Sequence, residues 1–364
     1  FWLKPCQRAQ KRSMLRQLKR RVSTWLESES DDLAGISLEY SYQDLAAATH
    51  GFDPENQLGA GAAGTVYRGF LRGGTEVAVK VLRGGPGGLN GFEDELRVLS
   101  RFRHPNLVTL LGWGQGDEDR LTKYLVYELM LGGDVERRLQ RSRKGQEPFP
   151  WQQRLRVALD AACGLSYMVN SEPKAFHRDI KPPNILLDVN GTAKMADFGL
   201  ASTITKKGQG HLTVEDISGT PGYACPKYIQ SGKVTEQSEV FSFGTVLLEI
   251  MLNERPALAG PQGEIVYPLV QIVQPAAPGA YERILGRLDP TAEWQAPCIE
   301  AFAHLALGCV SGRPEKRPPF EEIVETLRRL CQASGAGGGG QAPSQPAATL
   351  PPQVQRRSSQ GAAP

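Results

Sequence analysis

The pattern of apolar residues changes near residue 130, and this change divides the chain into two kinds of structure. Before that point, short stretches rich in β-branched and aromatic residues are separated by glycine turns: 65–67, 77–81, 107–111 and 124–127. One helical segment interrupts them, because Phe92, Leu96 and Leu99 are spaced i, i+4 and i+7. The pattern predicts a small lobe, residues 58–129, of about five strands with one helix.

Beyond Gly132 and Gly133 the apolar residues follow a helical period instead. The predicted helical segments are 151–167, 240–251, 299–310 and 320–330. They predict a larger, mainly helical lobe over residues 130–331. The expected fold class is therefore α+β, with a small β-rich lobe followed by a helical one.

Both ends of the chain differ from this central part. Residues 1–46 lack long apolar periodicity and are interpreted as a leader or linker, with a helix expected near 14–26. Residues 332–364 are rich in Gly, Pro, Gln and Ala and have Arg356 and Arg357 as their only charges. Such a composition cannot bury enough apolar surface to fold, so a disordered tail is expected.

Charge is unevenly distributed. Residues 1–22 contain eight Lys and Arg and no acid, and since the net charge of the chain is +3, the other residues carry −5. The basic segment is either a juxtamembrane region on an anionic membrane surface or a solvated linker. Salt-sensitive vesicle binding would distinguish the two. A charge so close to neutral gives no case for a nucleic-acid partner.

The six cysteines form no CxxC pair, which argues against a disulfide framework or a metal-ligand cluster and fits a reducing compartment. No apolar run reaches the length of about 18 residues that a membrane span needs. Phe1-Trp2-Leu3 ahead of the cations would suit the inner edge of a preceding span.

Residues 59–64, Gly-Ala-Gly-Ala-Ala-Gly, match the GxGxxG pattern between two predicted strands. The pattern alone is weak, since it recurs in the tail, and a simple turn is the alternative. Its strand–turn–strand context excludes Rossmann and Walker sites, and glycines there would let backbone N–H groups approach phosphates. Lys80 follows within an apolar strand, where a cation needs a partner, and Glu95 on the predicted helix is the candidate.

Two further motifs are His177-Arg178-Asp179-Ile180-Lys181-Pro182-Pro183-Asn184 and Asp197-Phe198-Gly199. With the glycine-rich loop and Val77-Ala78-Val79-Lys80, they resemble a eukaryotic protein kinase over residues 47–331. Phrases such as His104-Pro105-Asn106-Leu107-Val108 and Ser218-Gly219-Thr220-Pro221-Gly222-Tyr223 are similar to plant-type receptor-like kinases of the Pelle/IRAK group. The resemblance implies a two-lobed protein kinase fold.

The resemblance also implies roles for individual residues. Asp179 would accept the proton of the substrate hydroxyl, Lys181 would neutralise the γ-phosphate, and Lys80, held by Glu95, would bind the α- and β-phosphates. ATP would be the cofactor with Mg²⁺, or Mn²⁺ in its place, and Asn184 and Asp197 would be the metal ligands. The remaining nucleotide contacts implied are Leu58, Gly59, Gly61, Gly64, Val66 and Glu128.

Lys181 and Thr220 resemble the serine/threonine type, so the implied partner is a protein substrate. Thr213, Ser218 and Thr220 are candidate phosphorylation sites, with Arg178 as a cation that would receive a phosphate. Self-association would allow autophosphorylation. The expected location is the cytoplasm, at the inner face of the plasma membrane if the chain is the signalling part of a receptor-like kinase.

Two departures from the family pattern keep a rival interpretation open. Lys227 replaces a glutamate and would face Arg317 with like charge, unless its head group extends to solvent. Glu239 replaces an aspartate. Its extra methylene is expected to displace the carboxylate from the catalytic loop, the HRDIKPPN segment that carries Asp179. The alternatives to an active serine/threonine kinase are a weakly active or inactive scaffold and a small-molecule kinase. The latter is disfavoured by residues 219–223.

Overall fold

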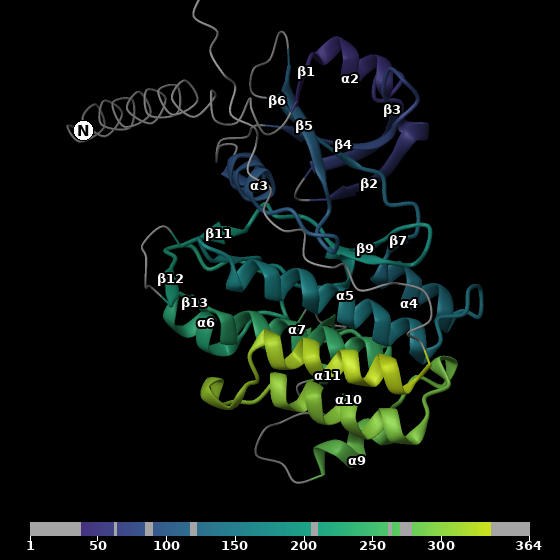
Figure 1. The fold of residues 1–364 in the computed structure, drawn as a ribbon, viewed down its shortest axis with the longest axis vertical. Helices are drawn as coiled ribbons and strands as arrows, with labels where there is room; N and C mark the ends of the chain where they lie inside the picture. The colour runs from purple at the N-terminus through teal and green to yellow at the C-terminus, as the bar shows by residue number, and fades with distance from the viewer. Residues whose placement is uncertain are drawn as a thin grey trace, which may run out of the picture.

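The computed structural model describes residues 38–61, 64–83, 90–116, 122–204, 210–260, 264–269 and 279–335. The basic segment 1–22, the helix expected near 14–26 and the tail from residue 336 lie outside the described residues. Two lobes are visible, one built on a sheet and one on helices (Figure 1).

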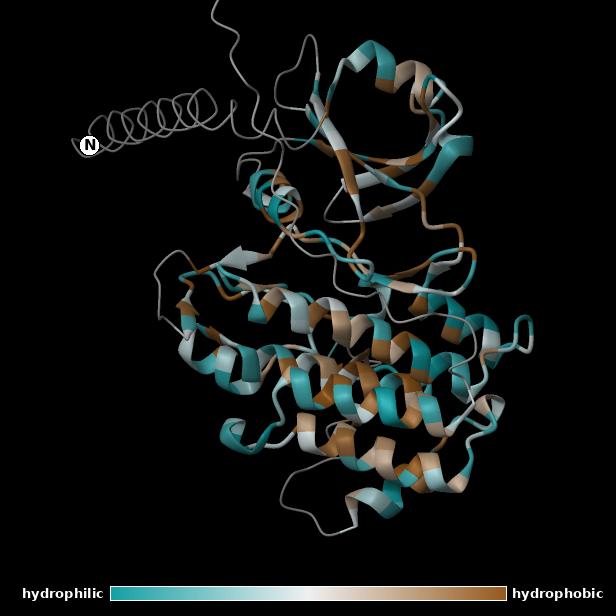
Figure 2. Cartoon of the chain, viewed as in Figure 1, coloured by the Kyte–Doolittle hydropathy of each residue, from teal (hydrophilic) through white to brown (hydrophobic). Residues whose placement is uncertain are grey.

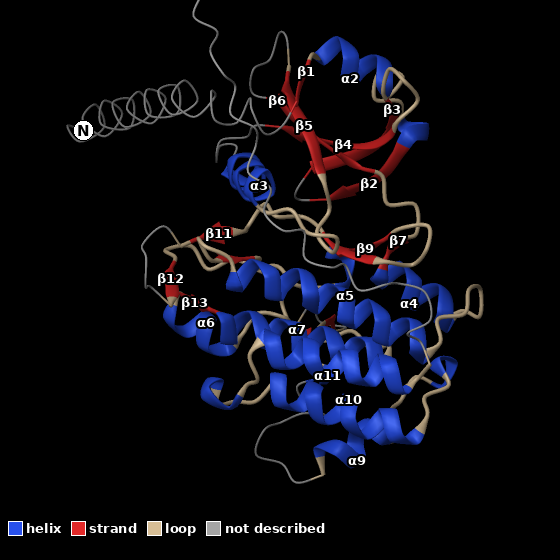
Figure 3. Cartoon of the chain, viewed as in Figure 1, coloured by secondary structure: helices blue, strands red, loops and turns tan. Residues whose placement is uncertain are grey.

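The small lobe is built on a six-stranded sheet with the strand order β1-β5-β6-β4-β3-β2 (Figure 3). The strands are β1 Leu38–Tyr40, β2 Gln57–Gly61, β3 Gly64–Phe70, β4 Glu76–Arg83, β5 Leu110–Gln115 and β6 Thr122–Glu128. Neighbouring strands are antiparallel except β1 and β5, which are parallel. The prediction for residues 107–111 was partly wrong, since β5 begins at Leu110 and Leu107 instead bridges Met195.

One strand and one helix of this lobe come from the segment expected to be a leader. Helix α2, Tyr42–Ala48, begins after Ser41, whose hydroxyl accepts a hydrogen bond from the Asp44 N–H at 3.1 Å. Its Leu45 is fully buried in a cluster with Val77, Val79 and Val126 on one face of the sheet. The expected boundary between residues 46 and 47 therefore falls inside a packed helix.

The close approach of β1 explains glycines in β5. A Cβ at Gly112 would lie 2.2 Å from the carbonyl oxygen of Leu38, and one at Gly114 would lie 2.6 Å from that of Tyr40. Side chains at these two positions would therefore push β1 off the sheet.

Helix α3, Asn90–Arg101, packs with Phe92, Leu96 and Leu99 in the other core cluster, which continues into the large lobe.

The large lobe is mainly helical. Its helices are α4 Val135–Arg143, α5 Trp151–Asn170, α6 Pro226–Ser231, α7 Glu236–Leu252, α9 Ala280–Leu285, α10 Ala296–Cys309 and α11 Phe320–Ala333. Figure 2 shows apolar residues concentrated in its central helices, and in α7 most residues are buried. Helix α11 includes two residues that the sequence assigned to the tail. The described helices include none long and apolar enough to cross a bilayer.

Short strand pairs lie around the boundary of the lobes and along the loops of the large lobe. They are β7 Gly133–Asp134, β8 Ala175–Phe176, β9 Ile185–Leu187, β10 Ala193–Met195, β11 Ser202–Thr203, β12 His211–Thr213, β13 Lys233–Thr235, β14 Leu258–Ala259 and β15 Ile265–Val266. β9 pairs with both β7 and β10, β8 pairs with β11, and β12 pairs with β13. The loops between these strands carry the HRDIKPPN and DFG motifs.

Candidate active site

A buried lysine joins two acids from different parts of the chain. Residues of β4 alternate between the two faces of the sheet, so that Val77, Val79 and Val81 pack with α2 and Lys80 faces the other way. The ammonium of Lys80 lies 2.8 Å from Glu95 on α3 and 2.7 Å from Asp197. The predicted pairing of Lys80 with Glu95 is thus confirmed, and the DFG aspartate joins the same cluster.

The charges in this cluster stabilise one another. Burial alone would lower the pKa of Lys80, but the carboxylates of Glu95 and Asp197 outweigh it and raise the pKa. Burial would raise the pKa of Asp197, but the neighbouring Lys80 ammonium reverses the shift and lowers it. The raised pKa of Lys80 and the lowered pKa of Asp197 both favour the ionised form of the cluster, with a protonated Lys80 and a charged Asp197.

Glu95 also fixes the DFG segment. Its second oxygen accepts a hydrogen bond from the backbone N–H of Phe198 at 3.2 Å, so one carboxylate holds both β4 and the segment. The ring of Phe198 is buried and lies 4.8 Å from the ring of His177. The preceding Asp197 has a φ of 61°, a left-handed conformation that this packing maintains.

Asp179 lies at the centre of a polar network. Its Oδ1 accepts a hydrogen bond from the Thr220 hydroxyl at 2.7 Å. Its Oδ2 lies 2.7 Å from the Lys181 ammonium and accepts a hydrogen bond from Asn184 Nδ2 at 3.0 Å. Lys181 also donates to the Thr220 hydroxyl at 2.9 Å. These contacts fix both carboxylate oxygens, which are mostly shielded from solvent.

The expectation that Glu239 is displaced from the loop was wrong. Glu239 is buried near the start of α7, and its carboxylate accepts hydrogen bonds from the backbone N–H of His177 at 2.6 Å and of Arg178 at 3.2 Å. Burial raises the pKa of Glu239 to about 7, and the hydrogen bonds from His177 and Arg178 oppose that shift. The longer side chain is accommodated by the packing and still holds the catalytic loop.

Arg178 connects that loop to the segment that follows DFG. Its guanidinium donates to the Leu200 carbonyl and the Ser202 hydroxyl, both at 3.1 Å, and to the Tyr228 hydroxyl at 3.3 Å. Both terminal nitrogens of Arg178 are thus engaged by protein groups, whereas its buried Nε has no hydrogen-bond partner among the described residues.

The three predicted phosphorylation sites differ in their surroundings. Thr213 is exposed in β12, and Ser218 is half-buried, with its backbone bonded to the Tyr228 hydroxyl. The hydroxyl of Thr220 is occupied by Asp179 and Lys181, so a phosphate there would meet a carboxylate.

Lys227 is exposed at the start of α6, which is the solvent-directed arrangement that the sequence left open. Arg317 is buried and donates to the carbonyls of Gln237 at 2.7 Å and Ser311 at 2.8 Å, and to Cys225 Sγ at 3.2 Å. Its guanidinium also lies 5.0 Å from the Phe241 ring. No carboxylate pairs with Arg317 in the described part of the chain.

The glycine-rich hairpin is formed by the end of β2 and the start of β3. Gly64 has a φ of 120°, and a Cβ there would lie 2.4 Å from the Val81 carbonyl oxygen, so the fold itself requires glycine. At Gly61 a Cβ would meet nothing within 4 Å, and at Gly59 only an Arg137 nitrogen 3.9 Å away. Packing does not explain these two glycines, whereas a phosphate approaching the backbone would.

The other predicted nucleotide contacts are Leu58, Val66 and Glu128, which belong to strands of the small-lobe sheet. Leu58 in β2 is partly exposed, and Val66 in β3 is half-buried opposite Lys80. The Glu128 carboxylate is engaged by Lys194 at 2.8 Å and by the Thr109 N–H at 2.7 Å. Glu128 could therefore reach a nucleotide only through its backbone.

Asn184 and Asp197 suit a metal ion that takes two ligands from the protein and others from phosphates. Asn184 donates through Nδ2 to Asp179, and no described hydrogen bond uses its side-chain oxygen. One carboxylate from Asp197 and one amide oxygen are hard ligands of the kind Mg²⁺ takes when phosphates supply others. Accordingly, no group of three His, Cys, Asp or Glu side chains among the described residues could hold a metal alone.

Sequence reasoning missed the role of Thr220 as a bridge and the position of Tyr127. Tyr127 ends the apolar run of β6 and is buried; burial raises the pKa of its hydroxyl, and the Glu95 charge adds to this. The apolar run that contains Tyr127 gave a signal for burial only. Thr220 carries no periodic signal at all.

Comparison with known proteins agrees with this geometry. A family model described as protein tyrosine and serine/threonine kinase matches residues 52–327. The chain is 36% identical over 318 residues to the probable serine/threonine-protein kinase PBL11 of Arabidopsis thaliana, covering 83% of this chain and 80% of that protein. It is 38% identical over 305 residues to probable serine/threonine-protein kinase PBL8 of the same plant, covering 80% and 72%. It is 39% identical over 309 residues to proline-rich receptor-like protein kinase PERK1, covering 82% of this chain and 46% of that protein.

Proposed function

Because the chain belongs to the family of protein tyrosine and serine/threonine kinases and is a serine/threonine protein kinase, we propose that it transfers the γ-phosphate of ATP through the residues around Asp179. The observation that carries this is the arrangement of Asp179 within hydrogen-bond reach of Lys181, Thr220 and Asn184. A substrate hydroxyl placed at this carboxylate would be oriented and would lose its proton to it.

Each polar group has a task in this proposal. Lys181 neutralises charge that develops on the transferred phosphoryl group. The Thr220 hydroxyl bonds to both Lys181 and Asp179 and holds the two side chains in position. Lys80 holds the nonreacting phosphates, and Glu95 keeps its ammonium in place. The backbone of the glycine hairpin approaches the phosphates from the other side.

A bound Mg²⁺ would supply positive charge that neutralises the phosphates. Asp197 and Asn184 would be its protein ligands, with Mn²⁺ as a substitute. The lowered pKa of Asp197, caused by Lys80 against the effect of burial, keeps this carboxylate ionised for that purpose.

The wider setting is proposed from the relatives. PERK1 is named a receptor-like kinase, and the basic segment 1–22 fits a juxtamembrane position at the cytoplasmic side of the plasma membrane. The partners would be a protein with serine or threonine hydroxyls, an anionic membrane surface, and a second copy for autophosphorylation, with Thr213 as its exposed site.

The test is phosphate incorporation from ATP and Mg²⁺ into a generic basic protein and into the chain itself. Asp179→Asn keeps the shape of the side chain but removes the base, so incorporation should fall by at least about 100-fold. Binding of a nonhydrolysable ATP analogue should persist in this variant. Equal incorporation by the variant would contradict the role of Asp179, and no incorporation by either protein would favour the scaffold.

A further inference from the structure

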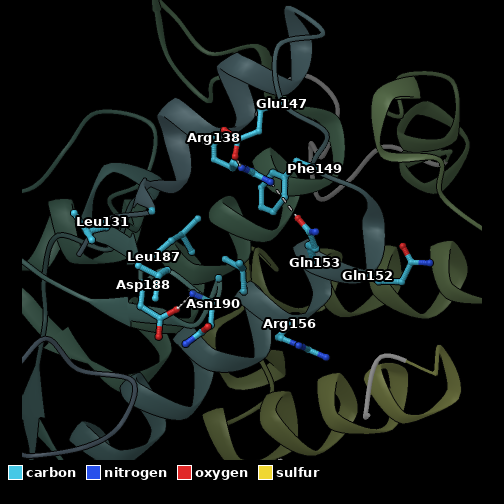
Figure 4. A pocket seen from close by; sticks show the side chains of 14 residues that line it. Leu131, Arg138, Glu147, Phe149, Gln152, Gln153, Arg156, Leu187, Asp188 and Asn190 are labelled. Atoms are coloured by element: carbon cyan, nitrogen blue, oxygen red, sulfur yellow. Dashed lines mark hydrogen bonds and ion pairs between the residues drawn. The ribbon is translucent and has the colours of Figure 1, made fainter. Parts of the chain in front are cut away.

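A groove of about 590 Å³ lies on the large lobe, and its lining includes neither Asp179 nor Lys80. Its walls come from α4, the start of α5 and the turn between β9 and β10 (Figure 4). Phe149 is buried, whereas Leu131 and Val189 are 54% and 71% exposed. These two large aliphatic side chains give the rim of the groove an exposed apolar surface.

The charges in this groove balance. Arg138 is paired with Glu147, and Asp188 accepts hydrogen bonds at 2.8 Å from the N–H groups of Asn190 and Thr192 in its own turn. Arg156 is the other cation of the lining and also has a partner. A charged ligand would gain no net attraction here, whereas an uncharged one has no charge to desolvate.

The remaining polar side chains are amides. Gln152, Gln153 and Asn190 line the groove, and Gln153 and Asn190 are exposed. Amide N–H groups can donate to the carbonyls of an extended peptide, and proline-rich peptides present such carbonyls without competing N–H donors.

The chain carries one segment of this chemistry. From residue 336 to residue 355 it has no charged side chain, and its only large apolar residues there are Leu350 and Val354, which flank Pro351 and Pro352. We infer that this groove binds residues 346–354 of the same chain, with Leu350 and Val354 against the exposed side chains of Leu131 and Val189.

The position of α11 permits this. The start of α5 forms part of the groove wall, and α5 is the helix against which α11 packs. Helix α11 lies along α5, and its last described residue is Gly335 (Figure 1). Leu350 is the fifteenth residue after Gly335, so the connecting chain can span up to about 50 Å.

Tethering makes a weak contact effective. If a free peptide binds with a Kd of about 100 μM, a tethered segment at an effective concentration of about 1 mM occupies the groove in about ten of every eleven molecules. The bound segment would then exclude other proline-rich peptides from the groove.

The test uses the full chain and a fluorescent peptide of residues 344–355, with fluorescence polarisation as the readout. Leu350→Asp with Val354→Asp frees the groove, and this variant should bind the peptide about tenfold more tightly than the unmodified chain. Adding Val189→Asp should abolish binding. Adding Ile229→Asp instead, at a comparably exposed aliphatic residue on α6, should leave binding unchanged.

Hydrogen exchange on the same proteins checks the location. Amides of residues 187–192 should exchange more slowly in the unmodified chain than in the Leu350→Asp, Val354→Asp variant. Equal peptide binding by these two proteins, or binding that survives Val189→Asp, would overturn the inference. Protection that rises with protein concentration would also overturn it, because the occupant would then be the tail of a second copy.

Discussion

The carboxylate of Glu239 lies 2.6 Å from the backbone nitrogen of His177, so one buried acid of α7 holds the loop that carries Asp179. The same carboxylate accepts from the N–H of Arg178, whose φ of 68° turns its side chain toward the segment after DFG. Since the Arg178 guanidinium binds that segment, Glu239 supports the catalytic loop directly and the segment through Arg178.

The first prediction concerns pH. The pKa of Glu239 is raised by burial from 4.5 to about 7, so the folded state binds this proton more tightly than the unfolded state. The contribution of Glu239 to the free energy of unfolding is therefore greatest below pH 4.5 and falls as pH rises to about 7, by up to about 3 kcal/mol. Glu239→Gln removes this titration, so the stability of the variant relative to the original chain should increase between pH 5 and pH 8.

Urea unfolding of both proteins across that range measures the difference. Burial also raises the pKa of Glu249 to about 7, with its Tyr223 hydrogen bond opposing the shift. The pH dependence of the original chain alone therefore does not show which of the two glutamates titrates. Glu249→Gln is the matched control for a second buried glutamate of α7. A difference between Glu239→Gln and the original chain that is constant with pH would contradict this account.

The second prediction concerns Lys80. Lys80→Met leaves the carboxylates of Glu95 and Asp197 without their cation, and Glu95 is almost fully buried. Removing one partner from a buried ion pair costs about 3–5 kcal/mol, so thermal unfolding should occur at a clearly lower temperature. Binding of an ATP analogue should weaken at the same time.

Lys194→Met is the control, because Lys194 is more exposed than Lys80 and pairs with a single carboxylate, that of Glu128. This change should cost about 1 kcal/mol or less. If both variants lost equal stability, the cluster around Lys80 would have no special electrostatic role.

The third prediction concerns Thr220. Thr220→Val keeps the shape but removes the hydroxyl that links Asp179 to Lys181, and kcat should fall about 10- to 100-fold. Thr220→Ser retains the hydroxyl and should recover most of the rate. Steady-state phosphorylation of a protein substrate separates kcat from KM, and a serine variant as slow as the valine variant would rule out the bridging role.

The sequence predicted the elements whose signal is local. Phe92, Leu96 and Leu99 indicated α3 by their spacing, and the need of a cation within the apolar strand β4 for a partner correctly paired Lys80 with Glu95 on that helix. Strand β1 was missed because three residues carry no periodicity, and its evidence lies in Gly112 and Gly114 on another strand.

The site was predictable as motifs but not as a network. Thr220 and Asp179 are 41 residues apart, and nothing in either motif specifies that their side chains meet. The placement of Glu239 was mispredicted, because whether one extra methylene displaces a carboxylate depends on how the surrounding core packs.

The last prediction concerns Arg317, a buried cation with no carboxylate partner among the described residues. Lys227, two residues beyond the Cys225 that contacts Arg317, stands where the kinase family has a glutamate. Lys227→Glu should supply the missing counter-charge and stabilise the fold by about 1 kcal/mol, which raises Tm by about 2 °C for a domain of this size. Lys227→Gln removes the like charge without adding a carboxylate, so its gain should be smaller. Calorimetry of the three proteins measures this, and a lower KM for the protein substrate in Lys227→Glu should accompany a firmer loop. If Tm and KM are the same in all three, Arg317 is sufficiently stabilised by the Gln237 and Ser311 carbonyls and the Phe241 ring, and the exposed Lys227 has no bearing on it.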